Sequence, residues 1–539
     1  MIKASNTTRP CVDINVHENS AWYALQSESL IVYSTLEKKH AAKFLGLDIS
    51  DHEQVVRALS ELPSPFAVVV EREELVLAAV DRFRSVPLFY SINREQFSLS
   101  DNVNDTLLSS AASKPDFNSI GHFLLCGHTL KDTTLFSSIF ALRPGQYGLY
   151  DKEQKSLVTD YFHRYSEKPD NASRSSPNQS DISNCYREAL AHLLQSASGK
   201  PLVIPLRGYE EDIFLLTLLS ETGYSNLIAV EYAPAPAKRR TGHKRIAKSL
   251  GVPLLHATLS RRQIRKAFRQ KKRRDYARFS CNHSHLPNYR SYFNLASLVE
   301  RDLIPQDSVI VDGAASPFCC AFASYRQIRP SDSSKSIDEH LWSSFFNLFP
   351  EFSREMAALK GSTWIKQLFD VEDGESELLK MTESWLRHER LPKVLINEKS
   401  VYQFLGLEFN FPFLNSNLLD CRDRYPTTQD AGRGFELELE RIFRSLSLLG
   451  IHSSMHLDPA ATGSVSVKLS NNKLGRYWDK ISYFLPQNKL LSPYQYRYFL
   501  LNYQNCCAQW ESAFAARHLL DELDILGYPQ EHLPAVVHK

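Results

Sequence analysis

The stretch from residue 202 to residue 232 reads LVIPLRGYEEDIFLLTLLSETGYSNLIAVEY, and its pattern decides the fold. It opens on the apolar run Leu202–Leu206 and continues through a polar loop into a helical pattern over 212–222, which Gly223 ends. A second apolar run follows at 226–232. Strand, loop, helix and strand at this spacing predict a βαβ unit whose two strands lie parallel.

The same alternation continues downstream. A helix is predicted over 241–250, closed by Gly251, and a third strand over 253–257. Beyond about residue 335 the spacing of tryptophans and leucines is mainly helical. In a parallel sheet of this kind, ligands bind beyond the carboxyl ends of the strands, so the loop 207–211 is the predicted place for nucleotide chemistry.

The first 160 residues have a different pattern. Short apolar or alternating runs at 66–70, 75–80 and 86–91 are separated by charged turns, and 142–150 reads as a turn followed by a strand. These runs predict two sheets packed on each other, with few helices. The polar stretch 164–183 reads as a linker, which gives three segments: 1–163, the linker 164–183, and 184–539.

Composition is that of a large globular protein. The 539 residues carry 63 Lys+Arg against 61 Asp+Glu, a net charge of +2 that argues for no class of charged partner. No apolar run approaches the ~20 residues that span a bilayer, and the N-terminus lacks a signal-like segment, so we expect a cytoplasmic protein without a membrane span.

The number and spacing of the cysteines also fit the expected cytoplasmic location. There are nine cysteines and no C-x-x-C pattern, so reduced, mostly buried thiols are expected. The run Cys281-Asn-His283-Ser-His285 alternates possible ligands and leaves a metal site open.

Five short motifs occur in a family-like order over roughly residues 50–430: AVDRFRSVPLFY (79–90), LRPGQY (142–147), PLRG (205–208), IVDG (310–313) and EFNFPFLN (408–415). Together they resemble the glutamine-hydrolysing asparagine synthetases and the asparagine synthase-like amide ligases. The resemblance implies a combination of α/β and α+β architecture. It comprises an αββα sandwich like that of class II amidotransferases, then a parallel-sheet domain like that of the adenine-nucleotide α-hydrolases (PP-loop type), with a helical C-terminal part.

The family chemistry has two steps. Glutamine is hydrolysed by an N-terminal cysteine, and ATP with Mg²⁺ adenylates a carboxylate that ammonia or another amine attacks. Here position 2 is Ile, and Cys11 would become N-terminal only by cleavage after Pro10. We therefore expect no glutaminase, and the catalytic residues stay unknown.

The phosphate loop also departs from the family. The Ser-Gly-Gly-x-Asp-Ser element becomes RGYEED (207–212), where Tyr209 adds bulk and three carboxylates add negative charge beside a polyanion. The second loop keeps Gly313 but is followed by no carboxylate. By position, the candidates for nucleotide binding are Arg207, Gly208, Glu211, Asp212 and Gly313. The candidates for metal binding are Glu211, Asp212 and Asp312.

Three functions are compatible with these residues. The first is a divergent ATP-dependent amidotransferase or amide ligase acting on a carboxylate, without its own glutaminase and using ATP and Mg²⁺. The second is an inactive pseudoenzyme, without a cofactor, that serves as a binding or regulatory subunit. The third is a binder of an acidic partner or nucleic acid through the basic run from Arg261 to Arg274.

The expected partner is a small carboxylate substrate or a protein, and a homodimer is left open. Nine of the fourteen residues from Arg261 to Arg274 are basic. We interpret them as a solvated helix face balanced by the acidic stretch 370–377, so nucleic acid is not the expected partner.

Overall fold

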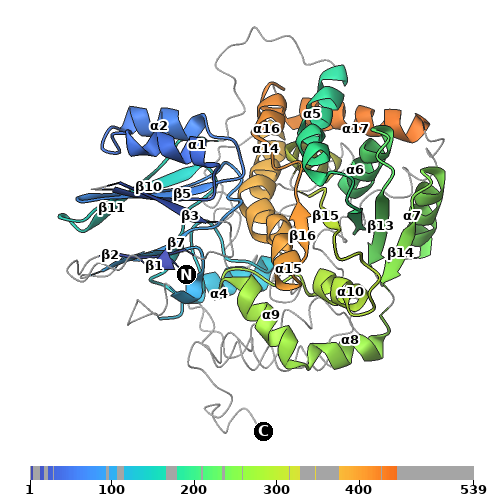
Figure 1. Cartoon of the computed structure of the whole chain (residues 1–539), viewed down its shortest axis with the longest axis horizontal. Coiled ribbons are helices and arrows are strands. Elements are labelled where there is room, and N and C mark those ends of the chain that lie inside the picture. The colour runs from blue at the N-terminus through green and yellow to red at the C-terminus, as the bar shows by residue number, and fades with distance from the viewer. Residues whose placement is uncertain are drawn as a thin grey trace.

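The computed structural model describes residues 2–3, 12–16, 22–27, 30–92, 96–105, 114–164, 179–207, 210–232, 237–257, 259–314, 316–327, 346, 375–425 and 428–445. Its architecture is mixed α/β, with two sheets from the N-terminal part of the chain and one parallel sheet from the remainder (Figure 1). In the described helices none is long and apolar enough to cross a membrane.

The two N-terminal sheets lie face to face. One has five strands in the order β1 (Ile2–Lys3), β2 (Val12–Val16), β8 (Phe97–Ser100), β7 (Phe89–Ile92) and β9 (Phe140–Ala141). The other has six antiparallel strands in the order β11 (Ser156–Tyr161), β10 (Gln146–Asp151), β6 (Leu75–Val80), β5 (Ala67–Arg72), β4 (Leu30–Ser34) and β3 (Tyr23–Ser27).

Successive side chains of β5 point to opposite faces of the six-stranded sheet, which explains how the two sheets and the helices form layers. Val69 packs with Ile14 and Leu99 between the sheets, whereas Val68 and Val70 face the opposite way. That outer face is covered by α1 (Lys38–Ala41), the 3₁₀ turn Ala42–Leu45 and α2 (His52–Ser60). The helix α4 (Phe117–Cys126) lies on the side of the five-stranded sheet away from α1 and α2 (Figure 1). The sequence pattern predicted this packing of two sheets on each other.

The third sheet is parallel throughout. Its order is β14 (Leu254–Ala257), β13 (Leu227–Tyr232), β12 (Leu202–Leu206), β15 (Val309–Val311) and β16 (Glu408–Asn410). The chain moves outward from β12 through β13 to β14 and then crosses to β15 on the other side. The strand order therefore reverses between β12 and β15, and the crevice at such a point is where parallel sheets bind ligands.

Helices cover both faces of this sheet. On one face Leu202, Ile204 and Leu206 of β12 join a core with α5 (Gln179–Ala197), α6 (Glu210–Glu221), α11 (Pro317–Gln327), α16 (Ser416–Asp423) and α17 (Thr428–Ser445). On the other, Val203 joins α9 (Lys271–Cys281), α10 (Tyr289–Val299) and α15 (Lys399–Phe404). The predicted strands 202–206, 226–232 and 253–257 and the helix at 212–222 are confirmed to within two residues at each end.

The predicted helix at 241–250 starts earlier, as α7 (Ala237–Ser249), and the basic run forms two helices, α8 (Arg261–Phe268) and α9. The run breaks at Arg269 and Gln270, which are the C-cap of α8 and the N-cap of α9. Residues 165–178 of the expected linker lie outside the described part, and α5 begins at Gln179. The division at 1–163, 164–183 and 184–539 stays a prediction.

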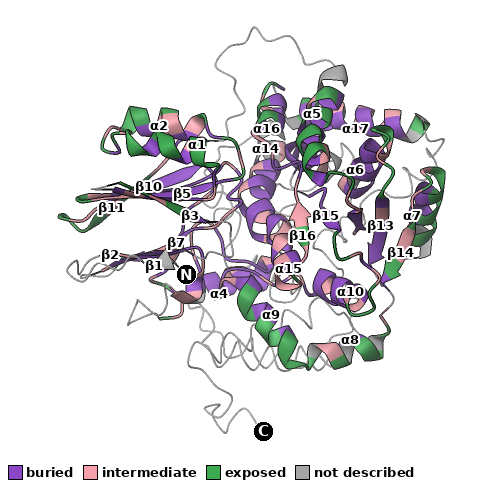
Figure 2. Ribbon diagram, viewed as in Figure 1, coloured by how far each residue is buried: buried purple, intermediate pink, exposed green. Residues whose placement is uncertain are grey.

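A helical segment joins the N-terminal sheets to the parallel sheet. It comprises α14 (Glu375–Trp385), a π-helix Leu386–Leu395, a 3₁₀ turn Ile396–Glu398 and α15. In Figure 1, α14 and α15 lie between the N-terminal sheets and the parallel sheet. A π-helix of ten residues is unusual, because such turns are mostly single bulges. Figure 2 shows that this connecting region is mostly buried, while the outer faces of α7, α8 and α9 are exposed.

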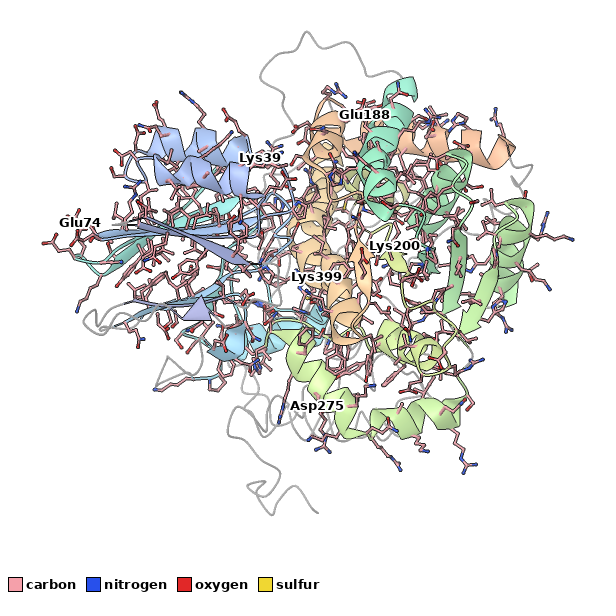
Figure 3. The ribbon with its side chains drawn as sticks, viewed as in Figure 1. Lys39, Glu74, Glu188, Lys200, Asp275 and Lys399 are labelled. Atoms are coloured by element: carbon pink, nitrogen blue, oxygen red, sulfur yellow. The ribbon has the colours of Figure 1, made fainter. Side chains whose placement is uncertain are left out.

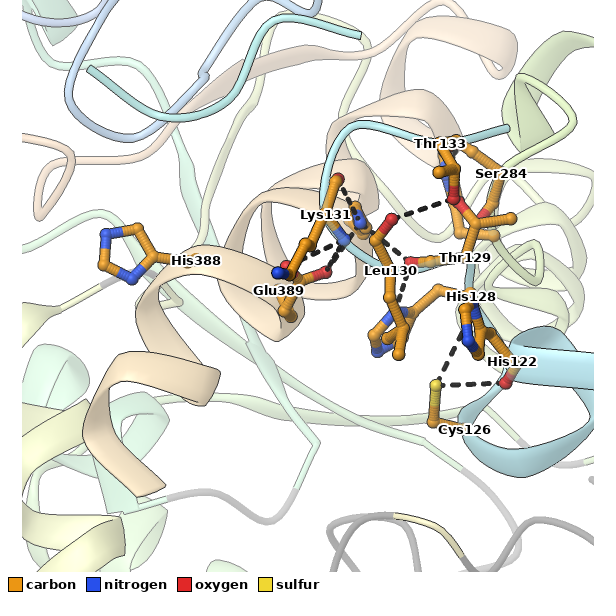
Figure 4. A network of polar contacts seen from close by, with 12 residues as sticks. His122, Cys126, His128, Thr129, Leu130, Lys131, Thr133, Ser284, His388 and Glu389 are labelled. Carbon is orange, nitrogen blue, oxygen red and sulfur yellow. Dashed lines mark hydrogen bonds and ion pairs between the residues drawn. The ribbon is translucent and has the colours of Figure 1, made fainter. Parts of the chain in front are cut away.

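Two lysines, the buried Lys393 and the half-buried Lys399, hold this segment against the N-terminal part. Lys393 Nζ donates to the carbonyl oxygens of Thr129 and Lys131, at 2.8 and 2.9 Å, and to Glu389 at 2.7 Å. The Glu389 carboxylate also accepts the backbone N–H of Lys131 (Figure 4). Lys399 Nζ donates to the carbonyl of Ser85 in the same way. We call Lys393, Glu389 and Lys399 the lysine clamp.

We expect Lys393→Met to lower the free energy of unfolding by about 3 kcal/mol, because it leaves the buried Glu389 carboxylate without its cation. Adding Glu389→Gln should recover part of that loss. Urea unfolding followed by circular dichroism measures both. The matched control is Lys39→Met, which removes an exposed lysine of α1 and should cost under about 0.5 kcal/mol. Equal losses in the two lysine variants would contradict the clamp.

Candidate functional site

The candidate site lies where β12 and β15 end. Arg207 follows β12 directly, Asp312 follows β15, and Asp212 belongs to the first turn of α6. Because β12 and β15 are parallel neighbours, their carboxyl ends meet at the reversal of strand order. Three of the residues predicted from the sequence are therefore brought to one place.

Arg207 binds both aspartates. Its Nη2 lies 2.6 Å from Asp212 Oδ1 and 2.6 Å from Asp312 Oδ1, and its Nη1 lies 3.0 Å from Asp312 Oδ2. The backbone N–H of Arg207 donates to the other Asp212 oxygen at 2.7 Å. Both carboxylates are fully buried, and 8% of the arginine side chain is exposed. We call Arg207, Asp212 and Asp312 the arginine cluster.

Further donors complete the coordination of Asp312. The hydroxyl of Tyr402, from α15, donates to Oδ2 at 2.5 Å, and the backbone N–H of Ala314 donates to Oδ1 at 2.8 Å. Each oxygen of Asp312 thus accepts two hydrogen bonds. A buried carboxylate held in this way is fixed in position and satisfied by the protein itself.

The charges of the cluster stabilise one another. Burial alone would lower the pKa of Arg207, but the Asp212 and Asp312 carboxylates outweigh it and raise that pKa. Burial raises the pKa of Asp212, and the guanidinium of Arg207 opposes the shift. The arginine therefore stays charged and offsets one of the two negative charges of the aspartates from within the protein.

The backbone of the loop after β15 also comes close to the first turn of α6. A Cβ on Gly313 would lie 2.9 Å from the carbonyl oxygen of Glu211, closer than side chains approach in practice. The loop after β15 and the first turn of α6 therefore touch, and only glycine fits at position 313. In a phosphate-binding loop, glycine lets the backbone approach an anion; here it lets two parts of the backbone approach each other.

The predicted metal ligands do not fit a magnesium ion in this arrangement. Mg²⁺ needs free carboxylate oxygens in near-octahedral geometry, whereas the oxygens of Asp212 and Asp312 already accept hydrogen bonds from Arg207 and its neighbours. Glu211 stands apart from these ion pairs, and burial raises the pKa of its carboxyl to about 7. No group of three or more ligands with metal-binding geometry occurs among the described residues.

The remaining predicted residues have separate outcomes. Gly208 lies outside the described residues, as do Tyr209 and Cys11. The metal site left open at Cys281, His283 and His285 is wrong: His283 Nε2 contacts Asn104 at 3.0 Å, and both ring nitrogens of His285 contact serine oxygens. No disulfide joins any of the six described cysteines.

Two functional neighbours were missed. Tyr402 lies in the region beyond residue 335 whose spacing predicts helices, and its hydroxyl completes the cluster. Glu398, just before α15, is buried close to Arg207 and Asp312 and accepts a hydrogen bond from Asn288 at 2.6 Å. The signal available was an acid directly before a helix, and the spacing gave no reason to connect it with residue 207.

A second polar cluster occupies the same edge of the sheet. Glu231, near the end of β13, accepts hydrogen bonds from His243 Nδ1 of α7 and His256 Nδ1 of β14, both at 2.8 Å. Burial opposes ionisation of Glu231, but the two imidazoles outweigh it and lower its pKa. This carboxylate ties α7 to β14 and is likewise satisfied inside the protein.

We expect Arg207→Met to lower the free energy of unfolding by about 3–5 kcal/mol, because two buried carboxylates lose their shared cation. The triple variant Arg207→Met, Asp212→Asn, Asp312→Asn should be more stable than the single variant. Urea unfolding of both proteins tests the order. A triple variant less stable than Arg207→Met alone would contradict the charge pairing in the cluster.

Glu398 should make stability depend on pH. Burial raises its pKa from 4.5 to about 7, so between these values the folded protein holds a proton that the unfolded chain has released. The free energy of unfolding therefore falls as pH rises through this window. Glu398→Gln removes the part of that fall that comes from Glu398, and its gain over the wild type should grow to at most about 3 kcal/mol at pH 7. Unfolding curves at pH 5, 6 and 7 measure this; the exposed Glu53→Gln is the control.

No family model matches the sequence, and no curated protein matches it. Among solved structures, the glutamine phosphoribosylpyrophosphate (PRPP) amidotransferase from B. subtilis, complexed with ADP and GMP, aligns at 13% identity and a TM-score of 0.16. The alignment covers 57% of this chain and 59% of that one, less than two thirds of the relative's length. A structure of the allosteric regulatory enzyme of purine biosynthesis aligns at 12% identity and a TM-score of 0.17, over 59% of this chain and 68% of the other. The likeness to glutamine amidotransferases is distant, and superpositions this poor carry no argument about function.

Proposed function

We propose that the protein is an asparagine-synthetase-like pseudoenzyme that serves as a binding or regulatory subunit. The observation that carries the proposal is the arginine cluster, in which Arg207 binds Asp212 and Asp312 at the reversal of strand order. The sequence resemblance puts ATP and Mg²⁺ at this point of the family fold.

A nucleotide would meet three obstacles here. The guanidinium of Arg207 is held by two carboxylates, so it offers little charge to a phosphate. The carboxylates that Mg²⁺ would need are bound to that arginine. Close contact of Gly313 with the Glu211 carbonyl leaves the backbone N–H groups little room to surround an anion.

The competing function is a divergent ligase that adenylates a carboxylate with ATP and Mg²⁺. It requires the cluster to open, with Arg207 turning to phosphate and Asp212 and Asp312 to the metal. Opening would expose the three buried charges or leave them without partners. Nucleotide binding would have to offset this cost of several kcal/mol. The closed cluster therefore favours the pseudoenzyme.

Titration calorimetry with ATP and excess Mg²⁺ should give no binding in the micromolar range. Exchange of labelled pyrophosphate into ATP, assayed over a panel of carboxylic acids including aspartate, should stay at the level of Arg207→Met. Because Mg²⁺ and nucleotide both need the cluster open, Mn²⁺ should give the same result. Micromolar binding of ATP, or exchange above that of the variant, would favour the ligase.

A further inference from the structure

The helices α8 and α9 present an exposed basic surface. Their outward-facing cations have little counter-charge within the described part of the chain. The surface is lined by Arg262, Lys266, Arg269, Lys271, Arg274 and Arg278, all exposed. We call these six residues the basic strip. In Figure 1 the helices lie along the lower margin of the molecule, and Figure 3 shows side chains extending outward around Asp275.

Ion pairing does not account for the strip. Within the described residues, Lys272 beside it contacts Glu300 at 3.9 Å, both exposed, while none of the six forms an ion pair. The acidic stretch 370–377, expected to balance these charges, lies outside the described residues for most of its length. The run is also not uniformly solvated, because Arg273 is buried and stands over the ring of Tyr289.

The placement of the charges works against the helices themselves. Neither α8 nor α9 has an acid in its first turn, and basic residues occupy those positions instead. Cations at a helix N-terminus oppose the dipole by about 0.3–1 kcal/mol each. A bound anion would relieve this repulsion at both helices. The positions of these cations therefore destabilise the helices in the isolated protein and favour binding of a polyanion.

The chemistry of the strip selects the kind of polyanion. Protein interfaces are usually built around a cluster of apolar anchors, but the exposed large apolar side chain described on these helices is Phe279 alone, and it packs on Phe404. Arginine, whose planar fork suits phosphate, provides four of the six cations. At 1.5 Å per residue the two helices are about 12 and 16 Å long, a length over which a duplex carries more phosphates than the strip has cations.

We propose that the basic strip binds the phosphodiester backbone of nucleic acid without reading its sequence. This binding is independent of the arginine cluster, and it revises the expectation from the sequence that nucleic acid is not a partner. Its signature is a strong dependence on salt, since each phosphate contact releases a counterion.

Fluorescence anisotropy of the full chain tests the proposal, using a labelled 20-base-pair DNA of random sequence and a 20-nucleotide single-stranded RNA. Affinity for one or both should fall steeply between 50 and 300 mM KCl. The variant Lys266→Gln, Arg269→Gln, Lys271→Gln, Arg274→Gln should bind at least tenfold more weakly at 100 mM KCl. Its salt slope for the duplex should be shallower by about 3–4.

The matched control removes four exposed cations at the other end of the molecule: Lys38→Gln, Lys39→Gln, Lys43→Gln, Arg57→Gln. It should bind like the wild type, and thermal melting should show both variants folded. Tighter binding of one probe assigns DNA or RNA as the source of the phosphates. Equal binding by the two variants, no binding to either probe, or binding only to vesicles containing phosphatidylserine would overturn the proposal.

Discussion

The charge pairing of Arg207 with two aspartates holds together the segments that follow the strands at the carboxyl edge of the parallel sheet. The guanidinium joins the end of β12, the first turn of α6 and the loop after β15, and through Asp312 it reaches Tyr402 of α15. Two buried carboxylates without this cation would be too costly to keep in the core. The close approach of Gly313 to Glu211 depends on the same pairing, because it holds both loops at one point.

The two kinds of sheet in this chain bury their apolar side chains in different ways. In the N-terminal part, alternating residues send one set of side chains between two sheets and the other set under α1 and α2. In the parallel sheet both faces are covered by helices, so β12 is apolar at all five positions. Polar groups are then confined to the strand ends, which is why the arginine cluster and the group around Glu231 share one edge.

The sequence predicted the regular elements well, since alternation in β5 and β6 and the strand–helix–strand spacing from residue 202 depend on local periodicity. It also placed Arg207, Asp212 and Asp312 in neighbouring loops. Their pairing was not predictable, because a phosphate loop and an internal ion cluster use the same residue types. The roles of Tyr402 and Glu398 depend on contacts with Asp312 and Asn288, which lie 90 and 110 positions away in the chain. Likewise, composition does not reveal the break between α8 and α9 at Arg269 and Gln270.

The lysine clamp has a consequence for how freely the facing loops can vary. Lys393 and Lys399 both donate to main-chain carbonyls, of Thr129, Lys131 and Ser85, and the N–H that Glu389 receives is main-chain too. What these side chains recognise is the path of the opposing chain, whatever residues it carries. The contact therefore tolerates substitution in the N-terminal loops and almost none in the lysine clamp. Changes of side chain in those loops leave the attachment in place as long as their backbone keeps its path.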